Sequence, residues 1–114
     1  MSVTLYGIPN CDTMKKARTW LDQRGIAYTF HDYKKLGADP AKLTHWVAEA
    51  GWEVLLNRAG TTFRKLPETD RADLDAAKAI TLMAANPSCI KRPVVEYPGG
   101  LLVGFKPHEW AAAF

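Results

Sequence analysis

The strongest constraint on the fold is the stretch of residues 3–16, where a strand-like run meets a helix-like run with a cysteine between them. Val3–Tyr6 is apolar and rich in residues that favour β-strands. Beyond the cysteine, apolar residues recur at helical spacing: Met14, Ala17, Trp20 and Leu21. The pattern predicts a strand, a tight loop and a helix that starts at Cys11.

The position of Cys11 at a helix start has a chemical consequence. The first turn of a helix exposes unpaired N–H groups and carries a partial positive charge. Lys15 adds a full positive charge one turn later. Such surroundings favour a thiolate, which is the reactive form of cysteine. One interpretation is therefore a nucleophilic cysteine in a redox or thiol-transfer enzyme, and the other is a small, buried and inert cysteine.

Composition narrows the class of protein. A chain of 114 residues fits one domain. Its net charge is +3, and the sequence has no long run of like charges that would indicate a nucleic-acid partner. Two cysteines, Cys11 and Cys89, do not make a disulfide scaffold, so we expect free thiols and a cytoplasmic protein. No apolar run is long enough to span a membrane. The three histidines are scattered, so no metal site is expected.

The first half of the chain alternates elements with clear boundaries. Gly25 should end the first helix, and Ile26–Tyr33 reads as a second strand, parallel to the first. A polar loop over residues 34–38 precedes Asp39-Pro40, which is a strong helix start, and Gly51 should stop that helix. A helical turn over residues 52–56 and a basic loop over residues 57–65 follow.

The second half predicts a helix and a hairpin. Residues 70–85 carry a helical apolar pattern with Asp70 or Asp73 as the cap. Val94–Tyr97 and residues 101–105 read as two strands joined by a turn, and Pro107 starts a last helix. The order β-α-β, helices, β-β-α predicts an α/β, thioredoxin-like (glutaredoxin-like) fold. Residues 1–114 would form a single domain with a helical insertion at about residues 39–86.

Three short motifs carry a resemblance to a known family, and together they are specific. They are Tyr6-Gly7-Ile8…Cys11-Asp12-Thr13…Lys15-Lys16-Ala17, Asn57-Arg58…Gly60-Thr61-Thr62 and Ile90-Lys91-Arg92-Pro93. The chain resembles the arsenate reductase (ArsC) family over essentially its whole length, and most closely the YffB branch. The resemblance implies that Cys11 is catalytic, that Arg58 and Arg92 bind an anion, and that the Arg92–Pro93 peptide bond is cis.

The chain departs from the arsenate-reducing members of the family at two cations. Those members usually carry an arginine before the last helix, where this chain has Lys106, and another four residues after the cysteine, where it has Lys15. Lysine supplies a point charge without the planar fork that suits a tetrahedral oxyanion. Both departures favour the YffB branch, which the resemblance associates with glutathione-dependent thiol reduction.

We therefore predict a glutathione-dependent thiol reductase that forms a mixed disulfide on Cys11. Met14 occupies the place of the second cysteine of a C-x-x-C pair, so glutathione must resolve that disulfide. Arg58, Arg92, Lys15 and Lys106 would bind the anionic groups, and Asn10 and Thr13 would donate hydrogen bonds. No tightly bound cofactor is expected. Expected partners are glutathione and a small oxidised or anionic substrate, with glutaredoxin as a candidate protein partner of a monomeric chain.

Several alternatives stay open. The first is an arsenate reductase coupled to glutathione and glutaredoxin. The second is a non-enzymatic transcriptional regulator like Spx, a relative that binds RNA polymerase, although Met14 removes the C-x-x-C switch common in such regulators. The third is a binding module with an inert Cys11. Cys89 is either an internal resolving thiol or a buried core cysteine, and the second interpretation is favoured.

Overall fold

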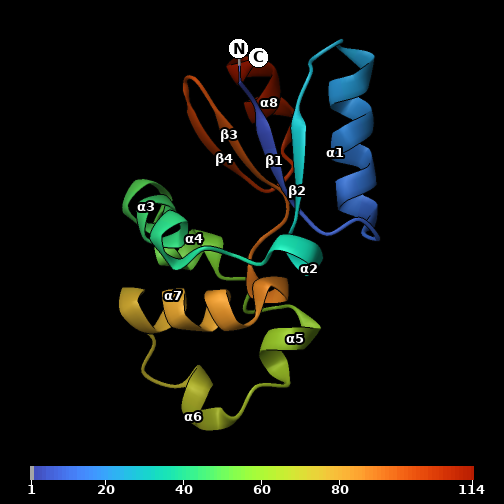
Figure 1. The fold of residues 1–114 in the computed structure, drawn as a ribbon. Coiled ribbons are helices and arrows are strands. Elements are labelled where there is room, and N and C mark those ends of the chain that lie inside the picture. Colours follow the sequence, from blue (N-terminus) through green and yellow to red (C-terminus); the bar gives the residue numbers. More distant parts are fainter. Residues whose placement is uncertain (1) are drawn as a thin grey trace. The chain divides into compact units, whose positions relative to one another are not determined.

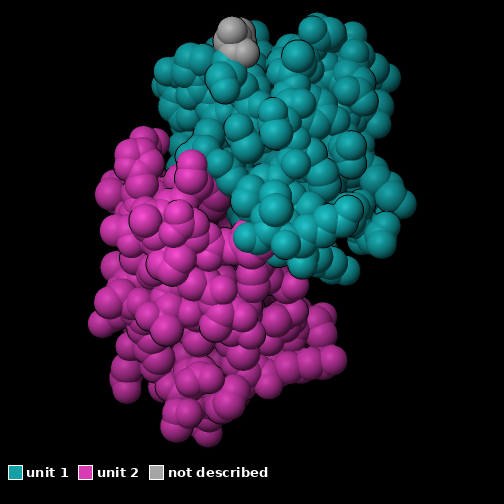
Figure 2. Space-filling model, in the orientation of Figure 1, with its two compact units in different colours: residues 1–36, 92–114 teal, residues 37–91 magenta. Residues whose placement is uncertain are grey.

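The computed structural model describes residues 2–114, which form two compact units (Figure 2). Unit 1 comprises the chain up to Leu36 and from Arg92 to Phe114, and unit 2 comprises Gly37–Lys91. Unit 2 corresponds to the predicted helical insertion and extends beyond residues 39–86 on both sides. That the two units make a single domain remains a prediction.

Unit 1 is built on a four-stranded sheet with the order β2-β1-β3-β4 (Figure 1). β1 runs parallel to β2 and antiparallel to β3, and β3 runs antiparallel to β4. α1 links β1 to β2, so the predicted βαβ unit and ββα unit are both confirmed. The elements of unit 1 are β1 (Thr4–Gly7), α1 (Asp12–Gln23), β2 (Thr29–Asp32), α2 (Tyr33–Leu36), β3 (Val94–Tyr97), β4 (Gly100–Val103) and α8 (Pro107–Ala113).

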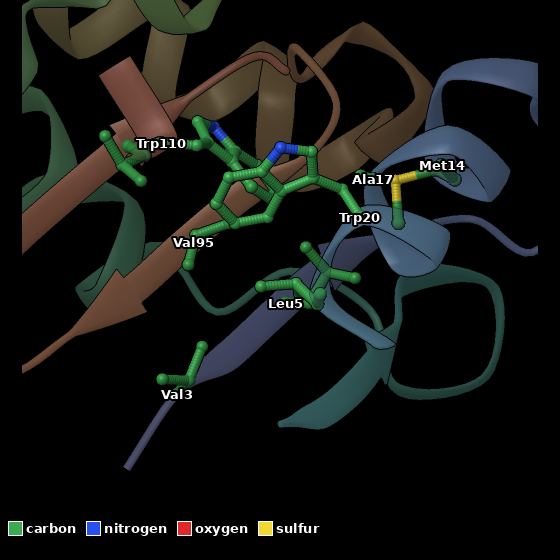
Figure 3. Close-up of a cluster of buried hydrophobic side chains, with 9 residues drawn as sticks. Val3, Leu5, Met14, Ala17, Trp20, Val95 and Trp110 are labelled. Carbon is green, nitrogen blue, oxygen red and sulfur yellow. The ribbon is translucent and has the colours of Figure 1, made fainter. Parts of the chain in front are cut away.

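The core of unit 1 lies between one face of the sheet and the helices α1 and α8 (Figure 3). Its buried members are Val3, Leu5, Met14, Ala17, Trp20, Leu21, Val95, Leu102 and Trp110. The rings of Trp20 and Trp110 meet edge to face with centroids 5.6 Å apart, and Trp110 Nε1 donates to the carbonyl of Gly104 at 3.1 Å. Each such large side chain stabilises the fold by about 1.5–3 kcal/mol through burial. The apolar spacing of α1 therefore fixes which side of that helix faces solvent.

Unit 2 is helical. α3 begins as predicted, because Asp39 Oδ1 accepts a hydrogen bond from the Ala41 N–H at 3.0 Å and Pro40 occupies the first turn. It ends before Gly51, whose φ of 91° suits glycine. The elements of unit 2 are α3 (Pro40–Ala50), α4 (Trp52–Leu55), α5 (Thr61–Arg64), α6 (Glu68–Arg71), α7 (Ala76–Ala85) and the 3₁₀ helix η1 (Pro87–Cys89).

The helix predicted over residues 70–85 is wrong in its first third. α7 begins only at Ala76, and its cap is Asp75 rather than Asp70 or Asp73, with Asp75 Oδ1 accepting from the Lys78 N–H at 2.8 Å. Asp73 adopts a positive φ of 51°, which interrupts the helix. The short helix α6 precedes this break.

The two predicted loops also contain helical turns. Residues 34–36 belong to α2, whose start is supported by Asp32 Oδ1 accepting from the Lys34 N–H at 2.9 Å. Within the predicted loop 57–65, α5 forms because Phe63 turns inward and is buried. The strands β2 and β4 are shorter than predicted, since each pairs over four residues only.

Candidate functional site

Cys11 lies at the N-cap of α1, as predicted. Its backbone is extended (φ −139°, ψ 130°), and its carbonyl accepts a hydrogen bond from the Lys15 N–H at 3.0 Å. The side chain caps no helical N–H group, and it is partly exposed. A thiol in this position is accessible to a substrate and lies against the positive end of a 12-residue helix.

A close contact between β1 and α1 holds this junction. A Cβ atom at Gly7 would lie 2.4 Å from Met14 Sδ, and Met14 is fully buried. Glycine at the end of β1 therefore lets the first turn of α1 pack directly on the strand. The same contact takes Met14, which stands where a second cysteine would be, into the core.

The sheet topology brings the other predicted residues of unit 1 to the same sheet edge as Cys11. Tyr6 pairs with Val94, so the end of β1 adjoins the start of β3, where Arg92 and Pro93 lie. The Gly104 N–H donates to the Pro93 carbonyl at 2.8 Å, which places the end of β4 there too. The Arg92–Pro93 peptide bond is cis, which confirms that prediction.

The predicted polar residues around this edge differ in exposure. Asn10, Thr13 and Lys15 are exposed, and Arg92 is half-buried. Lys106 is exposed at the N-cap of α8, and its Nζ lies 3.5 Å from Glu109 Oε2. An exposed pair of this kind contributes about 0–1 kcal/mol, so Lys106 can exchange Glu109 for an anionic ligand at little cost. The functional roles of these side chains stay predictions.

Arg58 belongs to unit 2. Its guanidinium carbon lies 5.5 Å from the centroid of the Trp52 ring, in a cation–π contact. The preceding residues are fixed by backbone pairing, since the Asn57 N–H donates to the Cys89 carbonyl at 2.7 Å. Arg58 is therefore exposed on a well-anchored segment of its unit, and its contribution to binding beside Cys11 stays a prediction.

Cys89 is a buried core cysteine, as favoured from the sequence. Its side chain is 1% exposed, and burial raises the pKa of its thiol. It lies in unit 2, whereas Cys11 lies in unit 1, and both thiols are free. A neutral, buried thiol is a poor nucleophile.

Tyr33 is a polar residue of unit 1 whose setting the sequence did not reveal. It is 3% exposed, and its hydroxyl has no hydrogen-bond partner within residues 2–114. Its ring stacks on Tyr6 at 6.2 Å, and Tyr6 donates a hydrogen bond to Glu96. Desolvation first, and then the charges at Tyr6 and Glu96, raise the pKa of Tyr33 far above its usual value. The predicted alternation of Tyr33 with His31 along a strand did not indicate this burial, because Tyr33 begins α2 instead.

The described residues contain neither a cluster of metal ligands nor a membrane-spanning helix. Over residues 2–114, no three His, Cys, Asp or Glu side chains gather as metal ligands. Over the same residues, every helix is too short or too polar to cross a membrane.

Comparison with known proteins gives a family match and close relatives. The model of the ArsC family matches residues 6–113. An uncharacterized protein of Haemophilus influenzae is 44% identical over 112 residues, which is 98% of each chain. The global transcriptional regulator Spx of Listeria innocua is 30% identical over 109 residues, covering 94% of this chain and 82% of the regulator.

Solved structures agree with this match. A protein described as YffB has 65% sequence identity and a TM-score of 0.95, with 97% of each chain covered. An arsenate reductase (ArsC) related protein of Brucella melitensis has 62% identity and a TM-score of 0.78, covering 98% of this chain and 93% of that one. The sheet order and the helices seen here therefore form the thioredoxin-like fold, as predicted.

Proposed function

This chain belongs to the ArsC family, and we propose that it is a thiol reductase that works through Cys11 and is regenerated by glutathione. The observation that carries the proposal is the position of Cys11, partly exposed at the N-cap of α1 and at the same sheet edge as the cis Pro93. The fold and the positive helix end both suit a thiolate nucleophile.

The first step is an exchange between sulfurs. The Cys11 thiolate attacks the glutathione sulfur of a mixed disulfide, a Cys11–glutathione bond forms, and the substrate leaves as a thiolate that takes a proton from solvent. In the second step a glutathione thiolate attacks the glutathione sulfur held on Cys11. Oxidised glutathione leaves and the Cys11 thiolate returns, so the substrate gains two electrons and two glutathione sulfurs are joined.

The resolving thiol comes from outside the chain. Met14 is a buried thioether and cannot attack a disulfide, and Cys89 is a buried, neutral thiol in the other unit. Free glutathione is the remaining thiol in the proposal. Arg92, Lys15 and Lys106 would bind its carboxylates with charge-assisted hydrogen bonds, and Arg58 would add a further cation. Asn10 and Thr13 would donate to the sulfur or the bound anion.

A coupled assay tests the proposal. The substrate is the mixed disulfide of glutathione and 2-mercaptoethanol, and oxidised glutathione is followed with glutathione reductase and NADPH. The wild-type protein and Cys89→Ser should turn over, Cys11→Ser should not, and mass spectrometry should find glutathione on Cys11. Failure of the wild-type protein to turn over at any glutathione concentration would overturn the proposal. Adding arsenate to the same assay tests the arsenate alternative, which the replacement of two arginines by Lys15 and Lys106 disfavours.

A second candidate function follows from the similarity to Spx. That similarity covers 94% of this chain, so a regulator that binds RNA polymerase is the main non-enzymatic alternative. Met14 in place of a second cysteine argues against a disulfide switch in this chain. Binding to purified RNA polymerase that survives Cys11→Ser, together with absent turnover, would favour the regulator.

A further inference from the structure

We propose that the substrate reduced at Cys11 is a polypeptide mixed disulfide, whose acidic residue beside the reacting cysteine binds in a groove along α1. The inference rests on the proposed function and names its substrate class. The groove opens on the surface of unit 1 with a volume of about 300 Å³. Its lining residues are Lys15, Lys16, Thr19, Trp20, Gln23 and Phe105, and we call it the α1 groove.

The α1 groove, whose lining residues on α1 run from Lys15 to Gln23, extends further from Cys11 than a glutathione joined to that residue can reach. The lining residues of α1 recur at spacings of three, four and eight, so they share one side of the helix. With a rise of 1.5 Å per residue, Gln23 lies about 18 Å along the helix axis from Cys11. Fully extended glutathione spans about 10 Å, and its sulfur sits on the middle residue. An extended polypeptide covers the same distance with about five residues.

The positive charge of the α1 groove indicates which residue type the substrate carries beside its own cysteine. Lys15 and Lys16 are exposed at the end closest to Cys11, and because the proposed function assigns Lys15 to glutathione, Lys16 is the cation that the substrate carboxylate would meet. Within the described residues no carboxylate lines the groove, and the acidic residues of α1, Asp12 and Asp22, lie outside it. A cationic entrance of this kind favours a carboxylate one or two residues from the substrate cysteine and disfavours a basic residue there.

The middle of the α1 groove is apolar and held in place. Trp20 is 9% exposed and is fixed between the Arg24 guanidinium, 3.7 Å from its ring centroid, and the edge of Trp110. Phe105 is half-buried and packs against Trp110 with centroids 4.9 Å apart. A rigid apolar surface loses little entropy when a ligand binds, so it suits an apolar residue of the substrate beyond the acidic one.

The chemistry is that of the proposed function. The Cys11 thiolate attacks the glutathione sulfur of a glutathionylated peptide, the Cys11–glutathione bond forms and the peptide sulfur–glutathione bond breaks. The peptide leaves along the α1 groove as a thiolate and takes a proton from solvent. A second glutathione thiolate then releases oxidised glutathione, so electrons and atoms balance.

The test compares three glutathionylated heptapeptides that differ only in the two residues flanking the central cysteine: Glu, Ala or Lys. The mixed disulfide of glutathione and 2-mercaptoethanol serves as the small substrate. We expect kcat/KM to be about tenfold higher for the Glu peptide than for the Lys peptide. Lys16→Glu should reverse that order. Lys35→Glu changes the net charge equally at an exposed lysine of α2 outside the groove, and it should keep the wild-type order.

The outcomes separate the two proposals. The groove proposal is overturned, and the proposed function stands, if the small substrate is reduced but the peptides show no charge preference. The same holds if Lys35→Glu abolishes that preference as fully as Lys16→Glu does. If nothing is reduced, the proposed function fails. Fluorescence anisotropy then measures binding of the Glu peptide to Cys11→Ser and tests the groove proposal independently of turnover. Loss of binding when Lys16→Glu is added supports the proposal, and no binding to Cys11→Ser overturns it. Thr19→Glu, at an exposed lining residue, replaces Lys16→Glu if that variant fails to fold.

Discussion

Each compact unit of this chain holds one cysteine, and the two side chains have opposite surroundings. Cys11 in unit 1 is partly exposed where a strand gives way to a 12-residue helix, with free N–H groups and Lys15 nearby. Cys89 in unit 2 is 1% exposed in a three-residue 3₁₀ turn. Its backbone N–H donates to the Asn86 carbonyl at 2.8 Å, and its carbonyl accepts from the Asn57 N–H at 2.7 Å.

The comparison teaches that the backbone around a cysteine decides its chemistry. At Cys11 the helix end supplies positive potential and solvent supplies access, and both suit the nucleophilic role proposed for this side chain. At Cys89 burial penalises the thiolate, and the side chain contributes packing instead. One residue type is therefore the proposed nucleophile in one unit and part of the core in the other.

The sharpest way to break this comparison is to replace each cysteine by serine. Cys11→Ser should lower turnover of the glutathione mixed disulfide by about 1000-fold or more, since the nucleophile itself is removed. Cys89→Ser should keep kcat/KM within about twofold at temperatures where it stays folded. The coupled glutathione assay measures both.

The variant that carries both Cys11→Ser and Cys89→Ser provides the control, because its turnover must equal that of Cys11→Ser alone. A large loss in Cys89→Ser, with unchanged circular dichroism, would mean that Cys89 resolves the mixed disulfide, and the division of roles would be wrong.

Alkylation of the native protein sharpens the same comparison without a substrate. Iodoacetamide at pH 7 should modify Cys11 at least about 100-fold faster than Cys89, because the buried thiol reacts only when unit 2 opens locally. Mass spectrometry of proteolytic peptides gives the two rates. In strong denaturant the two rates should converge, and comparable rates in the native protein would contradict the assignment.

Local chemistry made the boundaries of some elements predictable and hid others. The Asp39-Pro40 start and the Gly51 end of α3 follow from capping and backbone preferences alone. α5 was not predictable from the sequence, because one turn is too short to show periodicity and the burial of Phe63 that supports it depends on packing within the unit. The predicted start of α7 is wrong, because the two predicted caps, Asp70 and Asp73, precede the break in the helix and Asp75 caps it instead.

A side-chain contact accompanies the break before α7. The Lys78 side chain donates to the carbonyls of Thr69, at 2.6 Å, and Ala72, which closes the segment after α6 onto α7. Such a contact leaves no periodic signal in the sequence.

The candidate site was predictable to different depths. The strand–helix junction alone indicated Cys11, whereas Arg92, Pro93 and Lys106 came from the family resemblance. They reach the same sheet edge only because β3, distant in sequence, pairs with β1. The α1 groove was missed, because the exposed side of α1 reads as ordinary solvated surface until Phe105 completes it.

A smaller effect, on the free energy of unfolding, compares how tightly the chain is packed near Cys11 in unit 1 and near Arg58 in unit 2. Gly7→Ala should destabilise the protein by about 1–3 kcal/mol, since the new Cβ would meet the buried Met14 Sδ at 2.4 Å. Gly60→Ala in unit 2 should cost less than about 1 kcal/mol, because its Cβ would clash with the side-chain amide of Asn57, at 2.9 Å, which can swing aside, and meets the Asn57 carbonyl oxygen at an ordinary 3.8 Å. Chemical denaturation measures both, and an equal cost would show that the junction at Cys11 is no more tightly packed than the loop at Arg58.

The smallest expected effect is the pH dependence that Cys89 gives to stability. Its pKa is raised in the folded protein, so below about pH 8.5, the pKa of an unfolded cysteine, the thiol is neutral in both states and its contribution is complete. Above that pH the unfolded chain ionises first, and the free energy of unfolding falls by up to about 1.4 kcal/mol per pH unit until the folded pKa is reached. Denaturation at pH 7–10, in a Cys11→Ser background, should therefore show the stability advantage over Cys89→Ala shrinking above pH 8.5. Other titrating groups cancel in that difference, so an advantage that stays constant would mean that Cys89 is solvated, and the contrast between the two cysteines would lose its electrostatic basis.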